Sequence, residues 1–181
     1  FGIRSVVIDA LMLGAPLPEM LTDLKEVLCR EASSYAERVH ALSALLRLGD
    51  TGKDAICDAV GNLEITTNGI RLRAEVVTAL YGDPYTAKDV IALVNESFLA
   101  RDVDGSGLFW QLGDKLPLED LPEILDGVSP PERKGVGFDR RHWEVGSLYA
   151  RILVRAWQNP QPLDPARVLD WLRKRVIFKD G

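Results

Sequence analysis

The fold is decided by two stretches of similar sequence, YAERVHALSALLRLGD over residues 35–50 and NGIRLRAEVVTALYGD over residues 68–83. Both end in Gly-Asp, and their glycines, Gly49 and Gly82, are 33 residues apart. Each stretch carries apolar residues at helical spacing before the glycine. A glycine suits the end of a helix, where the backbone often becomes left-handed. The two stretches therefore predict two equivalent helices, one repeat apart.

The same step recurs on either side of these stretches. Gly14 lies 35 residues before Gly49, and Gly113 lies 31 residues after Gly82. After each glycine comes an acidic residue that opens a second apolar pattern, which predicts a second helix with the acid in its first turn, where the helix dipole favours negative charge. The four acids are Glu19, Asp54, Asp89 and Glu123. Each repeat is thus predicted to be a helix, a glycine turn and a second helix, with no strand.

Helix pairs of about 33 residues are typical of α-solenoids, in which each pair buries its apolar face against the next. We expect one all-α domain over residues 1–181, and the segment from Leu63 to Ile70 is predicted to be a loop. A fifth repeat is altered, because a Pro- and Gly-rich insertion at 129–138 precedes its long first helix. The predicted repeats are roughly 1–32, 33–66, 67–101, 102–129 and 139–176.

At Arg38-Val39-His40-Ala41 and Arg71-Leu72-Arg73-Ala74 the chain resembles HEAT-like repeat proteins. The resemblance implies an α-α superhelix whose second helices line a concave face, with Ala41 and Ala74 at the small position of the first helix. More narrowly, the drifting repeat lengths and the segment Ala156-Trp157-Gln158-Asn159-Pro160 are similar to the helical sensor regions of bacterial NACHT or STAND-type signalling NTPases. Because the chain opens on an apolar helix at Phe1, we expect it to be a fragment of a longer protein.

Charge divides the chain near Ser129. Up to that residue there are 21 acidic and 11 basic residues, and from Pro130 onward there are 6 acidic and 11 basic residues. The acidic part argues against nonspecific nucleic-acid binding over most of the molecule. Cys29 and Cys57 lack metal-ligand spacing and are expected to be buried thiols in a reducing cytoplasm. No apolar run is long enough to span a bilayer, so we expect a cytoplasmic chain without a membrane partner.

Two motifs resemble ligand sites only in part. Asp102, Asp104 and Ser106 match the first ligands of a calcium loop, but Gly113 stands where a bidentate carboxylate is needed, so a linker with a helix cap is the expected structure. Gly49-Asp50-Thr51-Gly52-Lys53 is too short for a phosphate loop and follows a helix. The two histidines, His40 and His142, form no catalytic or metal motif. We therefore expect no enzyme, metal or cofactor in this chain.

Two groups of residues are candidates for interaction. Acidic residues of the second helices would meet a positively charged protein or peptide, and a basic, aromatic cluster in the fifth repeat could stack a base and hold a phosphate, or could simply open a helix. We expect a noncatalytic interaction, scaffold or sensor module; the alternative is nucleic-acid binding by the basic, Trp-rich C-terminal repeat. Binding of a small molecule in a concave pocket is a third alternative. Trp157 and Trp171 are expected by default to pack inside, although aromatic residues also serve as anchors at interfaces. The candidate residues are Asp54, Asp58, Asp89, Arg140, Arg141, His142 and Trp143.

Overall fold

The computed structural model describes the backbone of residues 3–97, 110–129, 140–158 and 163–179, and side chains over 6–97, 112–129, 146–158 and 163–174. These residues form ten α helices and one 3-10 helix, and no strand occurs among them. The predicted all-α class is therefore confirmed. The chain divides into a first compact unit, Phe1–Glu64 with Asn68–Val76, and a second compact unit, Ile65–Thr67 with Val77–Gly181.

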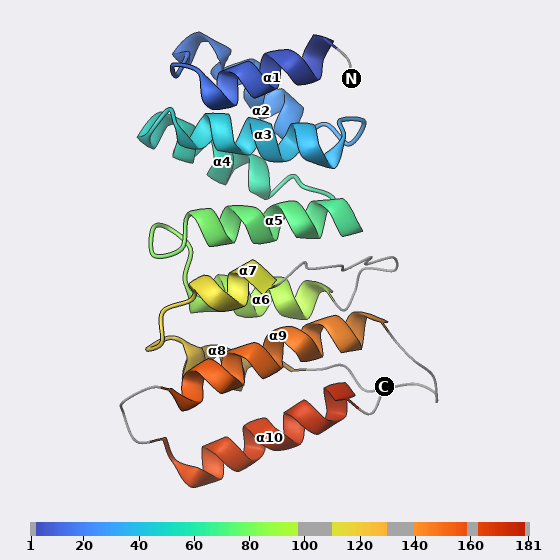
Figure 1. Cartoon of the computed structure of the whole chain (residues 1–181), viewed down its shortest axis with the longest axis vertical. Coiled ribbons are helices and arrows are strands. Elements are labelled where there is room, and N and C mark those ends of the chain that lie inside the picture. Colours follow the sequence, from blue (N-terminus) through green and yellow to red (C-terminus); the bar gives the residue numbers. More distant parts are fainter. Residues whose placement is uncertain (1–2, 98–109, 130–139, 159–162, 180–181) are drawn as a thin grey trace. The chain divides into compact units, whose positions relative to one another are not determined.

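The first compact unit is built around one central helix. Helix α3 packs against α1, α2 and α4, and α2 also packs against α4 (Figure 1). Leu28, Leu45 and Ile56 form the fully buried core between these helices. The helices are α1 (Ile3–Leu13), η1 (Pro18–Met20), α2 (Leu21–Cys29), α3 (Tyr35–Leu46), α4 (Asp50–Val60) and α5 (Thr67–Ala79), the last lying mostly in this unit.

The second compact unit has the longest helix as its centre. Helix α9 packs against α7, α8 and α10, and α8 also packs against α6. Leu112, Ile124, Tyr149 and Trp171 are buried between these helices. The helices are α6 (Ala87–Ser97), α7 (Trp110–Lys115), α8 (Leu121–Gly127), α9 (Arg140–Trp157) and α10 (Pro165–Lys179).

The predicted turn glycines are confirmed at two of four positions. Gly49 has φ 67° and Gly82 has φ 91°, and both follow the end of a helix. The left-handed prediction is wrong at Gly14, which follows α1 directly but has no positive φ, and at Gly113, which lies inside α7. At Gly14 the amide still donates to the Ala10 carbonyl, so the helical hydrogen bonding continues through that residue.

Three of the four predicted acids lie in the first turn of a helix, and one does not. Asp89 and Glu123 lie in the first turns of α6 and α8, and Glu19 lies in the first turn of η1. Asp54 does not, because α4 already begins at Asp50. Helix α5 likewise begins inside the segment predicted to be a loop, at Thr67.

One kind of contact recurs in both compact units: an arginine side chain donates to a backbone carbonyl near the end of an earlier helix. The Arg38 side chain donates to the Leu28 carbonyl, and the Arg73 side chain donates to the Leu63 carbonyl, each across ten residues of sequence. In the second compact unit Arg155 donates to the Leu116 carbonyl at 2.8 Å. The acceptors lie at or just past the end of a helix, where carbonyls lack an intrahelical partner. Arginines of later helices therefore satisfy the ends of earlier ones.

Candidate functional site

The three acids predicted to bind a basic partner have different surroundings. The Asp58 carboxylate pairs with Lys25 of α2 at 3.3 Å. The Asp89 carboxylate accepts hydrogen bonds from the backbone amide of Thr86 at 2.8 Å and from its hydroxyl at 2.9 Å, which caps the start of α6. Asp54 is exposed on α4. Two of the three acids therefore already serve the chain's own structure.

The side chains of the predicted basic, aromatic cluster and the whole calcium-loop segment lie outside the described residues. Arg140, Arg141, His142 and Trp143 form the first turn of α9, and their side chains lie outside the described residues. Asp102, Asp104 and Ser106 lie outside the described backbone as well. Within the described part of the chain, no group of three or more His, Cys, Asp or Glu side chains could hold a metal ion.

Four basic residues whose side chains are described in α9 and α10 contact other parts of the chain. Arg151 pairs with Asp114 at 3.3 Å, and Arg155 donates to carbonyls at the end of α7. Arg167 pairs with Asp126, and Lys174 donates to the Asp126 carbonyl at 2.8 Å. Phosphate binding by these four residues would have to compete with these contacts.

The two tryptophans predicted to pack inside differ. Trp171 is fully buried, as predicted. Trp157 is 71% exposed at the end of α9, so its predicted packing is wrong. Among the described side chains of α9, the buried apolar ones are Leu148, Tyr149, Ile152 and Ala156, and their face of the helix leaves Trp157 outside.

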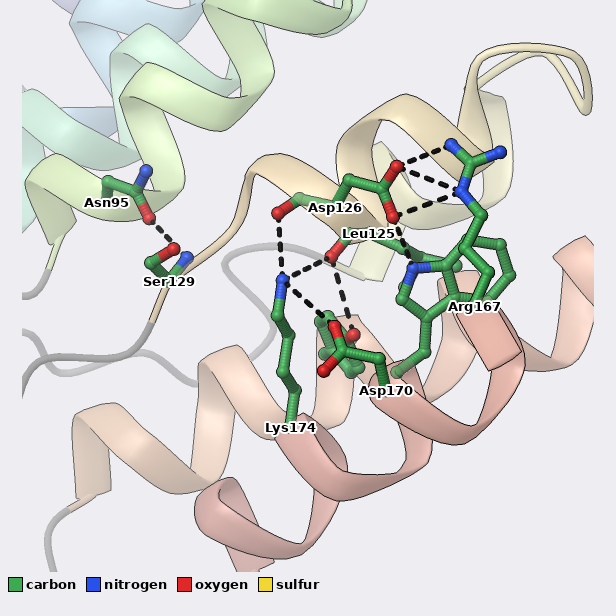
Figure 2. Close-up of polar contacts among 9 residues, drawn as sticks. Asn95, Leu125, Asp126, Ser129, Arg167, Asp170 and Lys174 are labelled. Atoms are coloured by element: carbon green, nitrogen blue, oxygen red, sulfur yellow. Dashed lines mark hydrogen bonds and ion pairs between the residues drawn. The ribbon is translucent and has the colours of Figure 1, made fainter. Parts of the chain in front are cut away.

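Asp126 of α8 is the centre of a polar cluster that holds α10 (Figure 2). Its carboxylate accepts from the Trp171 indole at 2.7 Å and from the Arg167 guanidinium at 2.9 Å. Partial burial raises the pKa of Asp126, but the hydrogen bonds from Arg167 and Trp171 and the charges of Arg167 and Lys174 outweigh burial, so the pKa lies below its usual value. All these partners belong to α10, so the cluster fixes α10 to α8.

His40 and the two cysteines lie among the described residues. His40 contacts the Asp9 carboxylate of α1, a partner that local sequence spacing could not reveal. Cys29 and Cys57 are free and half-buried, which corrects the prediction of fully buried thiols. Burial raises the pKa of the Cys29 thiol more than the nearby Lys25 and Arg38 lower it. A thiol with a raised pKa is a poor nucleophile at neutral pH.

An apolar groove of about 250 Å³ lies between α1, η1 and α2. Ile8 and Leu24, each 3% exposed, are its most buried residues, whereas Val7 is 46% exposed. Asp23 is the one charged residue that lines it. Helix α3 packs against both α1 and α2 but contributes no lining residue. The groove is lined by Val7, Ile8, Leu11, Met20, Asp23, Leu24 and Val27.

Sequence reasoning noted that α1 is apolar but did not find the groove. The available signal was that apolar residues occur around most of α1. A helix that buries a single face needs apolar residues on that face only. Val6 and Leu13 are also exposed on this helix, and Leu17 is exposed just after it.

No helix among the described residues has the length and apolar character needed to cross a bilayer. No family model matches the chain, and no curated protein or solved structure shows significant similarity to it.

Proposed function

We propose that this chain is a noncatalytic protein-binding module and that the α1–η1–α2 groove binds an amphipathic helix of its partner. The observation that carries the proposal is the groove itself, an open apolar surface in which Asp23 is the one charged lining residue. That lining offers almost only apolar contact, with the exposed Asp23 as a nearby charge that could orient a partner. In this proposal the chain is a scaffold or sensor part made of HEAT-like repeats, such as a bacterial signalling NTPase could carry.

The shape of the groove favours a helix as its occupant. Its residues follow helical spacing on both walls, with Val7 and Leu11 on α1 and Met20, Leu24 and Val27 on η1 and α2. Apolar rows of this kind can take up side chains at positions i, i+3, i+4 and i+7 of a third helix. Each aliphatic side chain that leaves water in such a groove contributes on the order of 1 kcal/mol or more.

Selection of helical peptides from a display library on the folded chain tests this function. We expect the selected peptides to carry aliphatic residues at helical spacing and to bind Val7→Glu at least about tenfold more weakly than the wild type, because the new carboxylate enters the apolar groove. Val154→Glu on α9 is the matched control, since Val154 is also an exposed valine, and it should bind the peptides unchanged.

Two results would contradict the proposal. One is a library that yields no peptide with helical apolar spacing. The other is a set of peptides that bind Val7→Glu as well as they bind the wild type, which would place their site elsewhere on the molecule.

A further inference from the structure

We infer that the groove is occupied by α10 of a second copy of this chain, so that copies associate head to tail. The inference rests on the proposed function, because it requires that the groove bind a helix. Three properties of the chain point to α10: its exposed stripe, the complementarity of that stripe to the groove, and the low cost of binding a helix that is already folded.

Helix α10 carries an exposed apolar stripe. Leu169 and Leu172 are 49% and 47% exposed, and Arg173 is exposed beside them. The spacing i, i+3, i+4 puts the three side chains on one face of the helix. Trp171, Arg167 and Lys174 hold a different face to α8 through Asp126 and Leu125 (Figure 2). The stripe therefore lies on a different face from these polar contacts with α8.

The stripe and the groove are complementary in polarity and charge. The stripe has two leucines and one cation, and the groove has aliphatic walls with the exposed Asp23 as its one charged lining residue. The segments around the stripe and the groove also carry opposite net charges. Residues 165–179 contain five basic residues and one acidic residue, whereas residues 19–31 contain four acidic and two basic residues. With the leucines in the groove, Arg173 can pair with Asp23, which fixes the direction of the bound helix.

Helix α10 is already folded and anchored, so its binding does not require a disordered segment to become ordered. The patch is small, and we expect weak association with a dissociation constant on the order of 10–100 µM. A head-to-tail contact leaves a free groove on one copy and a free stripe on the other. Association should therefore continue beyond dimers as concentration rises.

Analytical ultracentrifugation of the full chain tests the inference. Between about 5 and about 500 µM we expect the weight-average mass to rise with concentration and to rise less at high salt. Val7→Glu and Leu172→Glu should each remain monomeric, whereas the control Val154→Glu should associate like the wild type. Circular dichroism shows that each variant is folded. A wild type that stays monomeric throughout this range would overturn the inference.

Mixing the two monomeric variants is the decisive measurement. Val7→Glu keeps an intact stripe and Leu172→Glu keeps an intact groove, so an equimolar mixture should form a 1:1 dimer that cannot grow. A mixture that stays monomeric overturns the head-to-tail contact. As a second check, Asp23→Arg and Arg173→Glu should each weaken association by about tenfold, and the double variant should recover most of it; a double variant as weak as the singles excludes the ion pair.

Failure of this inference is distinguishable from failure of the proposed function. If the chain stays monomeric while the groove still selects helical peptides, the groove binds a different helix and the function stands. If the chain associates but no selected peptide depends on Val7, the proposed function fails, and the two monomeric variants then show whether the groove is involved at all.

Discussion

Replacing Arg38 by alanine is expected to lower the free energy of unfolding of the first compact unit by about 3–5 kcal/mol. Arg38 is 1% exposed. Its guanidinium pairs with both carboxylate oxygens of Glu64, at 2.6 and 3.1 Å, and donates to the Leu28 carbonyl at 2.8 Å. The alanine variant would leave a half-buried carboxylate and a helix-end carbonyl without this partner, and it would leave a cavity.

Hydrogen exchange of α3 amides measures this effect, because the four tryptophans all follow residue 100 and their fluorescence does not report on the first compact unit. Arg30→Ala is the control: Arg30 pairs with Glu26 at the surface, and its loss should cost less than about 1 kcal/mol. The double variant Arg38→Met, Glu64→Leu should recover most of the loss, since it removes both charges. Equal exchange in Arg38→Ala and Arg30→Ala would refute the assigned role.

Replacing Asp126 by alanine is expected to destabilise the second compact unit by about 2–3 kcal/mol. Most of the loss comes from the buried Trp171 indole, whose N–H would lose its acceptor. The ion pair with Arg167 contributes less, because both side chains are more than two-fifths exposed. Asp126→Asn should recover part of the loss, since an amide oxygen can still accept from the indole.

Tryptophan fluorescence during urea unfolding measures this change, since all four tryptophans lie after residue 100. The matched control is Asp114→Ala, which removes an exposed aspartate paired with Arg151 and should cost less than about 1 kcal/mol. Equal urea midpoints for the Asp126 and Asp114 variants would contradict the proposed role of Asp126 in fixing α10 to α8.

The lowered pKa of Asp126 adds a pH dependence to the same prediction. A carboxylate with a folded pKa below its unfolded value stabilises the protein above the unfolded pKa, and this stability is lost as pH falls through the folded pKa. The contribution should therefore be complete at neutral pH and disappear below about pH 4. Asp126→Asn should flatten the acid limb of the stability curve, and an unchanged limb would contradict the assignment.

The helices could be predicted because their signals are local. Apolar spacing predicted α3, α9 and the first turns of α6 and α8, and glycine predicted the left-handed turns at Gly49 and Gly82. Gly113 shows where this reasoning fails. A glycine can also lie within a helix beside a neighbour, and here Leu148 lies 3.1 Å from where a side-chain carbon would be.

The surfaces could not be predicted because they depend on contacts between distant residues. The partner of Asp58 is 33 residues away, and the partner of Arg167 is 41 residues away, so spacing within one helix reveals neither. The groove depends on which faces of α1 and α2 remain after α3 has packed. The exposure of Trp157 follows in the same way from the face of α9 that the other helices cover.

The recurrent arginine contacts also determine where the chain can change length. Leu28 and Arg38 are ten residues apart, as are Leu63 and Arg73, although the intervals between the repeat glycines vary from 31 to 35. An inserted residue inside either ten-residue segment would move the guanidinium away from its carbonyl. The turn that follows each first helix varies in length, since three residues separate α3 from α4 and seven separate α5 from α6. Insertions and deletions should therefore be tolerated better in these turns than in the two ten-residue segments.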